Sequence, residues 1–432
     1  MTPEVKQRIE QIRQGIVPEG YVKDKDGIYP RDWASKKIGQ WLKLAERPIV
    51  LQDEEEYQLV TVRRGFGGVD SRGSFLGKNV LVKNYFIVKT GDFIISKRQI
   101  AHGACGIVPP ELYGAVVSNE YNVFLPQDGT NIQMFNLMMQ LPHYKRLFYL
   151  MSDGVHIEKL LFKTQDWMKR TLAMPLLKEQ KKIAEILATQ DKAIELQGRK
   201  IEELKRFKKG CLEKMFPRKG QKVPEKRFPG FTDDWEQRKA IDIADYSKGN
   251  GYSKGDLTDA GTPIILYGRL YTKYQFAISE VDTFAVPRNG AVYSQGNEVI
   301  VPASGETAED IARASAVEKS GVLLGGDLNI LRPFDFITPL FLALAISNGE
   351  PQKELAKKAQ GKSVVHIHNT DIQEVTIAYP SRTEQDRIVS VFRQLDNLIT
   401  LHQRKLEEMK KQKKALMQLL LTGIVKTKGE VR

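Results

Sequence analysis

The chain has 432 residues, of which 41% are hydrophobic and 28% charged, and its net charge is +13. This composition is typical of two or three folded domains and excludes general disorder, and the lack of any run of about 18 apolar residues excludes a transmembrane helix. The two cysteines stand far apart and neither belongs to a CxxC pair, which excludes a disulfide scaffold and indicates a reducing cytoplasm.

Residues 1–32 are predicted to form an N-terminal helix and a lead-in. The helix is expected over residues 3–14, and the first residues lack the apolar core of a secretory signal. The stretch Gln-Gly-Ile-Val at 14–17 is close to Thr-Gly-Ile-Val at 422–425. This likeness predicts that the short helix corresponds to the C-terminal end of a later helix. The first and last segments of the chain would then belong to the same repeat.

Residues 33–174 are predicted to form a mixed α/β domain. Residues 57–64 are rich in β-branched and aromatic types and predict a strand, and residues 93–97 predict a short buried strand after a glycine turn. Residues 131–140 predict a short apolar helix. Glycines crowd the stretch 65–77, which indicates turns.

A long amphipathic helix is predicted over residues 175–216, and Pro217 ends it because proline cannot continue the helical hydrogen-bond ladder. Residues 217–234 form a linker. A second α/β domain is predicted over 235–379, with strands at 262–271 and 298–302 and an apolar helix at 339–348. A second long helix over 380–423 and a tail over 424–432 complete the chain.

The second half of the chain repeats the frame of the first. Residues that recur 205 positions later are Glu179 as Glu384, Asp191 as Asp396, Arg199 as Arg404 and Lys209 as Lys414. The stretch 91–96 matches 296–301 at the same offset, and an Asp-Trp pair opens each block. Between these anchors the blocks share little. The pattern predicts a pseudo-two-fold internal repeat, in which the anchor residues recur and the blocks between them differ.

Heptad positions a and d of both long helices are mostly apolar. They carry Ile183, Leu187, Ile194, Ile201 and Leu204 in the first helix, and Ile388, Phe392, Ile399, Leu406 and Met409 in the second. Polar residues such as Gln197 and His402 interrupt this seam, and such groups reduce stability but fix register. We expect the two helices to pair as an antiparallel coiled coil. The alternatives are packing of each helix on its own domain and pairing with another chain. The charged outer faces are either solvated or a docking surface.

No catalytic or cofactor motif is found in the sequence. The stretch Gly361-Lys-Ser lacks the first glycine of a phosphate-binding loop, because Ala356 stands there. His366 and His368 share a strand face, but a metal site needs three or four ligands, so no metal is expected. The chain is therefore predicted to bind and recognise a partner, and its positive charge favours nucleic acid as that partner.

Two unlike blocks, each opened by Asp-Trp and closed by a repeated Pro-x-x-x-Glu-Gln helix, resemble the specificity subunit of type I restriction–modification systems. The most specific matches are Pro175 with Glu179-Gln180 and Pro380 with Glu384-Gln385, and the resemblance covers nearly the whole chain. It implies an α+β fold with two mixed α/β target recognition domains, residues 33–174 and 235–379. Two long helices that form an antiparallel coiled coil would separate these domains.

The resemblance also implies function and partners. In the family each recognition domain reads one half of a split, asymmetric site in double-stranded DNA, and the helices set the gap between the halves. Two modification subunits methylate adenine with S-adenosylmethionine, and two restriction subunits use ATP and Mg for translocation and cleavage. This chain is then expected to bind no cofactor itself, to be no enzyme alone, and to contact no membrane.

Two other functions stay open at this point. One is a structural coiled-coil adaptor without a DNA role. The other is a fragment of a fused restriction–methyltransferase enzyme, which the missing catalytic motifs argue against.

Candidate DNA-contacting residues lie in glycine-rich loops of both blocks. Phosphate contacts need lysine or arginine, and base edges favour arginine, asparagine and glutamine. The candidates are Arg63, Arg64, Arg72, Lys97, Arg98 and Gln99 in the first domain, and Arg269, Tyr271, Lys273, Tyr274, Gln295, Asn297 and Arg313 in the second. The alternative for each of them is a solvated loop residue.

Overall fold

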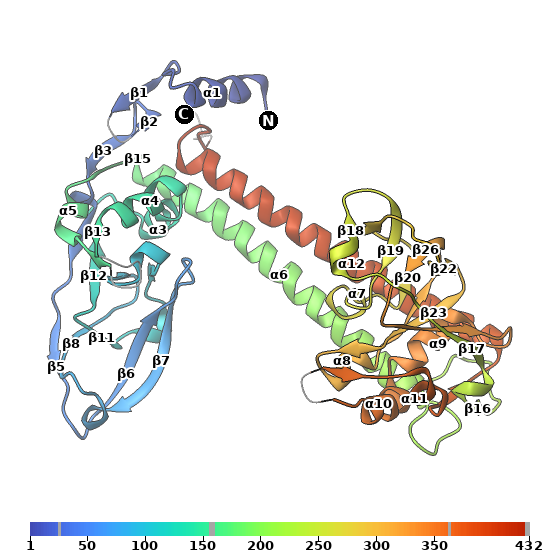
Figure 1. Cartoon of the computed structure of the whole chain (residues 1–432). Helices are drawn as coiled ribbons and strands as arrows, with labels where there is room; N and C mark the ends of the chain where they lie inside the picture. The colour runs from blue at the N-terminus through green and yellow to red at the C-terminus, as the bar shows by residue number, and fades with distance from the viewer. Residues whose placement is uncertain (25–26, 155–159, 362–363, 428–432) are drawn as a thin grey trace. The chain divides into compact units, whose positions relative to one another are not determined.

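The computed structural model describes residues 1–24, 27–154, 160–361 and 364–427. It divides into two compact units, the first made of Met1–Leu196 with Leu406–Arg432 and the second of Gln197–Lys405. Each long helix, α6 (Leu177–Met215) and α12 (Arg382–Leu421), contributes one part to each unit (Figure 1). None of the helices in the described ranges is long and apolar enough to cross a membrane.

The first unit alternates short strands and helices. Its elements are α1 (Pro3–Arg13), β1 (Tyr21–Asp24), β2 (Gly27–Pro30), β3 (Ala34–Lys37), α2 (Ile38–Trp41), β4 (Leu42–Leu44), β5 (Pro48–Val50), β6 (Glu56–Val62), β7 (Val69–Leu76), η1 (Gly77–Asn79), β8 (Asn84–Ile87), β9 (Phe93–Ser96), η2 (Ile100–His102), β10 (Cys105–Ile107), η3 (Pro110–Leu112), β11 (Val116–Ser118), β12 (Tyr121–Pro126), α3 (Ile132–Met139), α4 (Pro142–Leu150), β13 (Ser152–Asp153), β14 (Leu161–Phe162), α5 (Thr164–Met168) and β15 (Thr171–Met174).

The second unit follows the same plan. Its elements are β16 (Glu236–Lys239), η5 (Ala240–Asp242), β17 (Ala244–Lys248), η6 (Lys254–Asp256), β18 (Leu257–Thr258), β19 (Thr262–Ile265), α7 (Arg269–Thr272), β20 (Ala277–Ile278), β21 (Phe284–Ala285), β22 (Tyr293–Gln295), β23 (Glu298–Pro302), β24 (Ser304–Gly305), α8 (Ala308–Ile311), β25 (Ser315–Val317), β26 (Ser320–Leu324), β27 (Leu328–Pro333), α9 (Pro339–Ile346), α10 (Gly349–Lys358), β28 (Val365–His366), α11 (Asn369–Gln373) and β29 (Thr376–Tyr379).

The strand predicted over residues 262–271 is only partly correct. β19 ends at Ile265, and Arg269 begins a helical turn, in which the backbone N–H groups of Arg269 and Leu270 donate to the carbonyls of Leu266 and Tyr267 at 3.0 Å. The Arg269 side chain then pairs with Asp282, 13 residues later. This non-local contact stabilises the turn and overrides the strand propensity of the aromatic residues.

The two units share the central part of their sheet topology, whereas the edge strands β5, β18 and β20 have no counterpart. The first contains sheets ordered β10-β9-β12-β4 and β5-β8-β11-β6-β7, and the second contains β17-β27-β23-β25-β20 and β18-β21-β19-β26-β22. The strands β4, β12, β9 and β10 have the same antiparallel neighbours as β17, β27, β23 and β25. The strands β8, β11, β6 and β7 correspond to β22, β26, β19 and β21, with one parallel pair in each set. The internal repeat therefore extends through domains whose sequences have diverged.

Aromatic side chains dominate both cores. In the first unit the fully buried rings of Phe93, Phe124, Phe135 and Trp167 have centroids 5.3–6.5 Å apart. Such tilted and edge-to-face pairs add to the burial of apolar area. In the second unit α9 is buried from Phe341 to Ile346, as expected for a helix without a polar face.

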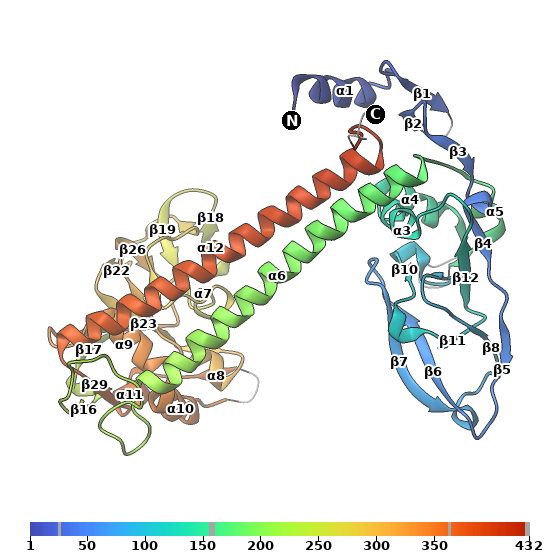
Figure 2. The ribbon, with the colours of Figure 1, turned by 180° about the vertical axis from the view of Figure 1, so that it is seen from behind.

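The two long helices lie side by side and antiparallel within each unit (Figures 1 and 2). In the first unit Lys413 pairs with Asp191 at 2.5 Å, and in the second Lys208 pairs with Asp396 at 2.5 Å. These two ion pairs are equivalent at the 205-residue offset. Gln197 donates to Nδ1 of its own equivalent, His402, at 2.8 Å and to the His402 carbonyl at 2.9 Å. The helices of this one chain therefore pair with each other, in the register that the repeat requires.

None of the seam residues is exposed. Six of them are buried, namely Ile183, Leu187, Ile201, Ile388, Phe392 and Ile399, and four are half-buried, namely Ile194, Leu204, Leu406 and Met409. Near their first turns both helices merge with the domain cores, since Ile183 and Leu187 pack with the first core and Ile388 and Phe392 with the second. The apolar residues of each helix therefore pack first against a domain core and, farther along the helix, against the other long helix.

The glutamine of each Pro-x-x-x-Glu-Gln motif fastens a long helix to its domain. Gln180 is fully buried; its side-chain oxygen accepts from the N–H of Asn131 at 2.7 Å, and its amide donates to the carbonyls of Gly129 and Pro175 at 2.8 Å. Asn131 is the N-cap of α3. One side chain therefore joins the start of α6 to the start of the helix beneath it.

Gln385 makes the same three bonds in the second unit. It accepts from the N–H of Thr338, the N-cap of α9, at 2.8 Å and donates to the carbonyls of Phe336 at 3.0 Å and Pro380 at 2.9 Å. The adjacent glutamates differ. Glu384 is 1% exposed and takes a bidentate pair from Arg227 at 2.8 Å. Glu179 is half-buried, and this burial raises its pKa.

Both chain ends lie in the first unit and are bonded to each other. The Tyr21 hydroxyl donates to the Gly423 carbonyl at 2.6 Å, Arg8 donates to the Ile424 carbonyl at 2.5 Å, and Lys426 pairs with Asp32 at 2.7 Å. Gly423 has φ +69°, and a Cβ there would lie 2.4 Å from Pro30, so this position requires glycine. Gly15, at the end of α1, also has a positive φ of 75°.

Substitution of Gln385 by alanine is expected to lower the free energy of unfolding by about 3 kcal/mol, because the buried N–H of Thr338 and two carbonyls lose their partner. Thermal and denaturant unfolding of the purified chain measure this loss. Gln394→Ala, at an exposed position of the same helix, is the matched control and should change little. Equal stabilities of the two variants would contradict the clamp.

Candidate nucleic-acid interface

Most of the candidate residues gather on two connections in each unit. In the first unit these are the β6–β7 connection, with Arg63 and Arg64, and the stretch after β9, with Lys97–Gln99. In the second unit they are the β19–β21 connection, residues 266–283, and the stretch 303–314 after β23. Since β6, β7 and β9 correspond to β19, β21 and β23, these connections are topologically equivalent.

In the first unit the two connections are fastened together. The N–H groups of Gly65 and Phe66 donate to the carbonyls of His102 and Gly103 at 2.7 and 2.8 Å. Phe66 has a left-handed φ of 60°, and a Cβ on Gly103 would lie 2.9 Å from its ring. The hairpin tip that carries Arg63 and Arg64 is thus held against the turn that follows Gln99.

The charges of this first cluster face solvent. Arg63 pairs with Asp70 and Arg98 with Glu120, both at 2.6 Å and both exposed, so these pairs are weakly bound and can exchange for phosphate. Arg64 and Arg72 are also exposed, and Lys97 is half-buried. The side-chain oxygen of Gln99 is buried and accepts no hydrogen bond from the described residues.

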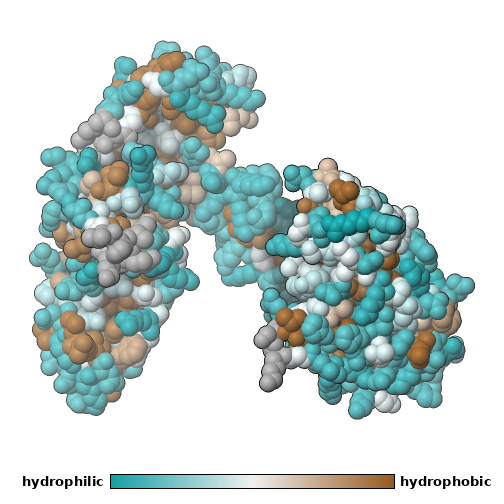
Figure 3. All heavy atoms as spheres, viewed as in Figure 1, coloured by the Kyte–Doolittle hydropathy of each residue, from teal (hydrophilic) through white to brown (hydrophobic). Residues whose placement is uncertain are grey.

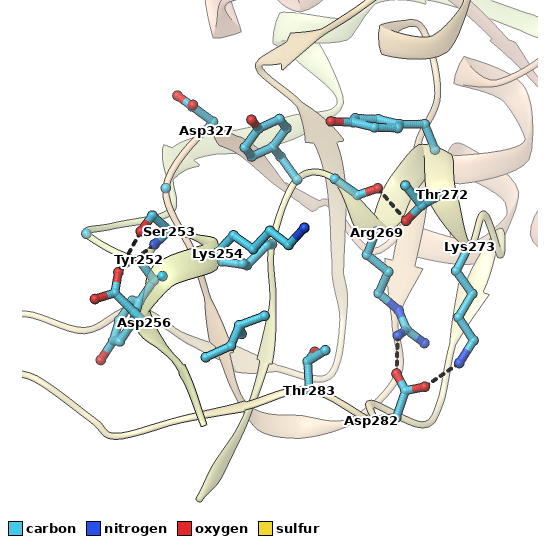
Figure 4. Close-up of a pocket in the computed structure, with 18 residues that line it drawn as sticks. Tyr252, Ser253, Lys254, Asp256, Arg269, Thr272, Lys273, Asp282, Thr283 and Asp327 are labelled. Carbon is cyan, nitrogen blue, oxygen red and sulfur yellow. Dashed lines mark hydrogen bonds and ion pairs between the residues drawn. The ribbon is translucent and has the colours of Figure 1, made fainter. Parts of the chain in front are cut away.

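In the second unit the equivalent connection lines one side of a hollow, a pocket with a volume of about 1070 Å³ (Figure 4). Residues 251–257 form one side and residues 266–273 the other, with Asp282, Thr283 and Asp327 at its margin. Three tyrosines, Tyr252, Tyr267 and Tyr271, contribute rings and hydroxyls to the lining. The lining therefore offers apolar area together with hydrogen-bonding groups.

Arg269 and Lys273 converge on one carboxylate at the edge of the hollow. Arg269 binds Asp282 at 2.6 Å and Lys273 binds it at 2.5 Å, and these two donors hold the pKa of Asp282 down to about 2. The Arg269 side chain is only 9% exposed and also donates to Gln275 and to the Glu280 carbonyl. Arg269 therefore shapes the connection, since both of its terminal guanidinium nitrogens have acceptors within it, whereas its buried Nε has no acceptor among the described residues.

Lys254 is a basic residue that the sequence analysis missed. Its side chain is exposed and extends into the hollow in Figure 4, and it forms no ion pair with any residue in the part of the chain that the structure describes. The stretch 246–256 is rich in turn-forming glycines, namely Gly249, Gly251 and Gly255. A lysine between glycines opposite a strand-to-strand connection is the signal that could have identified it.

Tyr274 lines a different groove, beside α6 and α12, and Arg313 lies over its ring. Burial raises the pKa of Tyr274 to about 12, and Arg313 lies 5.6 Å over its ring while pairing with Asp310 at 2.9 Å. Tyr274 lines this groove with Lys208 and is absent from the hollow. The structure thus does not bring these two candidates together with Tyr271 and Lys273.

Gln295 and Asn297 are exposed on the loop that precedes β23. Glu298, which is fully buried, accepts from the N–H groups of Gln295, Gly296 and Asn297 at 2.6, 3.0 and 3.2 Å. This loop is therefore rigid, but β23 separates it from the stretch at 303–314.

No metal site accompanies these loops in the part of the chain that the structure describes. Within residues 1–24, 27–154, 160–361 and 364–427, no three His, Cys, Asp or Glu side chains are placed to hold a metal ion. His366 instead bonds through Nδ1 to the Ser304 hydroxyl at 3.0 Å. The face seen in Figure 3 is largely hydrophilic.

The family model of the type I restriction modification DNA specificity domain matches residues 30–206 and again 232–411. The chain belongs to this family. Each copy of the family domain spans one divergent block and most of the long helix that follows it. The predicted resemblance, and with it the two-domain fold, is confirmed.

Relatives match along almost the whole chain. The type I restriction enzyme MjaVIII specificity subunit of Methanocaldococcus jannaschii is 22% identical over an alignment of 424 positions, which covers 93% of this chain and 94% of the relative. The putative type I restriction enzyme MjaX specificity subunit of the same organism is 22% identical over an alignment of 436 positions, which covers 95% of this chain and 97% of the relative.

Solved structures of family members share the fold. A chain from a study of complex assembly and conformational transition of the type I R-M system aligns with a TM-score of 0.58 at 16% identity, over 92% of this chain and 99% of that one. The S subunit of M. genitalium aligns with a TM-score of 0.53 at 13% identity, over 90% and 96%.

Replacement of Arg64 by alanine is expected to weaken sequence-specific DNA binding by about 1–3 kcal/mol if its guanidinium reads a base. The measurement is the affinity of the assembled complex for its own site and for an unrelated duplex at fixed salt. Arg13→Ala removes an equal charge from the exposed end of α1 and is the control. Unchanged affinity and unchanged site preference would remove Arg64 from the reading surface.

Replacement of Lys254 by alanine is expected to weaken binding to all duplexes alike and to reduce the slope of log affinity against log salt by about 1, because one phosphate contact is lost. A titration over several salt concentrations measures the slope. Lys226→Ala, in the linker, is the matched control. A change in base preference without a change in slope would contradict the phosphate contact.

Proposed function

We propose that the chain is the DNA-recognition subunit of a type I restriction–modification complex, and that its two units read the two halves of a bipartite, asymmetric site in double-stranded DNA. The observation that carries this proposal is the pair of equivalent connections. They stand on one frame, β6–β7–β9 or β19–β21–β23, yet differ in length and side chains. Recognition of two different half-sites requires two domains that share a strand arrangement and differ in their loops.

The chemistry of the partners follows from the same proposal. Adenine methylation with S-adenosylmethionine belongs to two modification subunits, and ATP- and Mg-dependent translocation and cleavage belong to two restriction subunits. The chain itself supplies positioning, in keeping with its net charge of +13 and its loop-borne lysines and arginines. The paired helices would act as the spacer between half-sites. We place the complex in the cytoplasm.

Methylome sequencing of a cell that expresses this chain with its modification subunit tests the proposal directly. The expected result is methyladenine in a split motif with two defined halves and an undefined gap. A complex that assembles but methylates no such motif, or binds no duplex, would favour the adaptor function. Methyl transfer by the purified chain alone would favour the fused enzyme.

Exchange of residues 235–379 for the corresponding block of another family member is expected to change one half of the motif and leave the other half unchanged. The reason is that this block carries its own two sheets and its own pair of connections, while Gln385 and the helix seam remain in place. Methylome sequencing of the chimera reads both halves at once. A change in both halves would show that the domains do not read independently.

A further inference from the structure

One wall of the hollow in the second unit is an insertion. Six residues, 63–68, join β6 to β7 in the first unit, whereas eighteen residues, 266–283, join the corresponding strands β19 and β21. The longer connection contains α7 and β20, and β20 pairs with β25 at the edge of a sheet. Leu270 and Ile278 of this connection are each 1% exposed and belong to one core cluster. This wall is therefore a folded element.

The opposite wall, residues 251–257, is also fixed by contacts inside the unit. The Asp256 carboxylate accepts from the Ser253 N–H at 2.8 Å and pairs with Arg288. The Tyr252 hydroxyl accepts from the Arg288 N–H at 2.8 Å, and the Arg288 guanidinium lies 5.2 Å from the centre of the Tyr252 ring. Since both walls are held in this way, the hollow is formed before any ligand binds.

The lining contains one cation that the chain itself does not neutralise. Arg269 and Lys273 both pair with Asp282, whose pKa of about 2 keeps it ionised at neutral pH. Lys254 has no ion-pair partner among the described residues, and Figure 4 shows its side chain extending into the hollow. An ammonium group is a compact point charge with three donors, which suits a phosphate. The hollow therefore offers a place for one phosphate group.

Aromatic rings face this ammonium group from the wall that contains α7. Tyr267 and Tyr271 are half-buried, and their ring centroids are 6.1 Å apart. Burial raises the pKa of Tyr271, so its hydroxyl stays protonated at neutral pH and can donate a hydrogen bond. Tyrosine rings stack with nucleobases of every kind, because each base has a flat face. Rings on one wall and an ammonium group on the other are the combination that a nucleotide requires.

The concave shape of the hollow decides how a nucleotide can reach it. Its volume of about 1070 Å³ lies just above the range of roughly 300–1,000 Å³ for small-molecule sites, so a base with its sugar and phosphate fits. Direct reading of a duplex needs an element that protrudes into a groove, because the base edges lie there. A cavity cannot enter a groove. A base of DNA reaches a cavity only by leaving the stack, as in enzymes that act on extruded bases.

We propose that the hollow binds one nucleotide unstacked from the half-site that the second unit reads, with its base against Tyr267 and Tyr271 and its phosphate on Lys254. The proposal rests on the proposed function, because that function supplies the duplex. This nucleotide is distinct from the adenine that a methyltransferase extrudes into its own active site. The two units then read their half-sites differently, since the short connection 63–68 of the first unit lacks the insertion.

A series of duplexes with single abasic positions tests the proposal. In each duplex one base of the half-site that follows residues 235–379 in the block exchange stands opposite an abasic position, so that its extrusion needs no unpairing. The complex of the chain with its modification subunit is expected to bind one such duplex at least tenfold more tightly than the fully paired site. Duplexes altered at a methylated adenine are left out. Fluorescence anisotropy at fixed salt measures the affinities.

Two variants link this gain in affinity to the hollow. Tyr271→Ala removes a stacking ring, and Thr272→Trp fills the hollow from an exposed position of its lining. Each is expected to abolish the gain, because a base that is not captured stays in the stack. Tyr293→Ala, 42% exposed on β22 and outside the lining, is the matched control and should keep the gain. Thermal unfolding of each variant checks that it is folded.

A gain at no position, or a gain that a folded hollow variant retains, would overturn the proposal. So would binding of free deoxynucleoside monophosphates (dAMP, dCMP, dGMP and dTMP) to the purified chain without any position-dependent gain, since the hollow would then serve a free nucleotide. A complex that methylates its split motif but shows no gain contradicts this proposal alone. A complex that methylates no split motif defeats the proposed function.

Discussion

The buried glutamine at the start of each long helix is the contact on which the remaining architecture depends. Gln180 and Gln385 each satisfy one N–H at a helix N-cap and two carbonyls that no other side chain in the described residues reaches. Because both glutamine side chains are fully buried, an alternative angle between helix and domain would leave their polar atoms without partners. The clamp therefore sets the direction in which each helix leaves its domain.

The long helices divide their length between two tasks. Near the clamps their apolar residues complete the domain cores, and farther on they pair with each other through the Lys208–Asp396 and Lys413–Asp191 contacts and the Gln197–His402 pair. Polar pairs at these positions disfavour a shift by one heptad, since a shifted helix would bury unpaired amide and ammonium groups. The register of the two long helices is thus fixed by polar contacts as much as by apolar burial. The loops of the domains can therefore change without disturbing it.

Much of this arrangement could be predicted from the sequence, because it is written in local periodicity. The amphipathic pattern predicts both long helices to within about two residues of their ends, and the apolar runs at 93–97 and 298–302 coincide with β9 and β23. The conformation near residue 269 could not be predicted, because it depends on an ion pair with Asp282 that is formed only after folding. The same contact holds the Arg269 side chain against Asp282, while Lys254 on the opposite wall forms no ion pair with the described residues.

The placement of both chain ends in the first unit has a consequence for biosynthesis. The second unit is continuous, from Gln197 to Lys405, whereas the first needs Leu420, Leu421 and the Gly423 carbonyl to complete the core around Trp33 and the bond from Tyr21. During synthesis on the ribosome, the unit whose translation begins first is therefore the unit whose folding is completed last. Its incomplete core must wait while residues 197–405 of the second unit are translated, so its exposure to aggregation and to chaperones lasts for about half of the translation time.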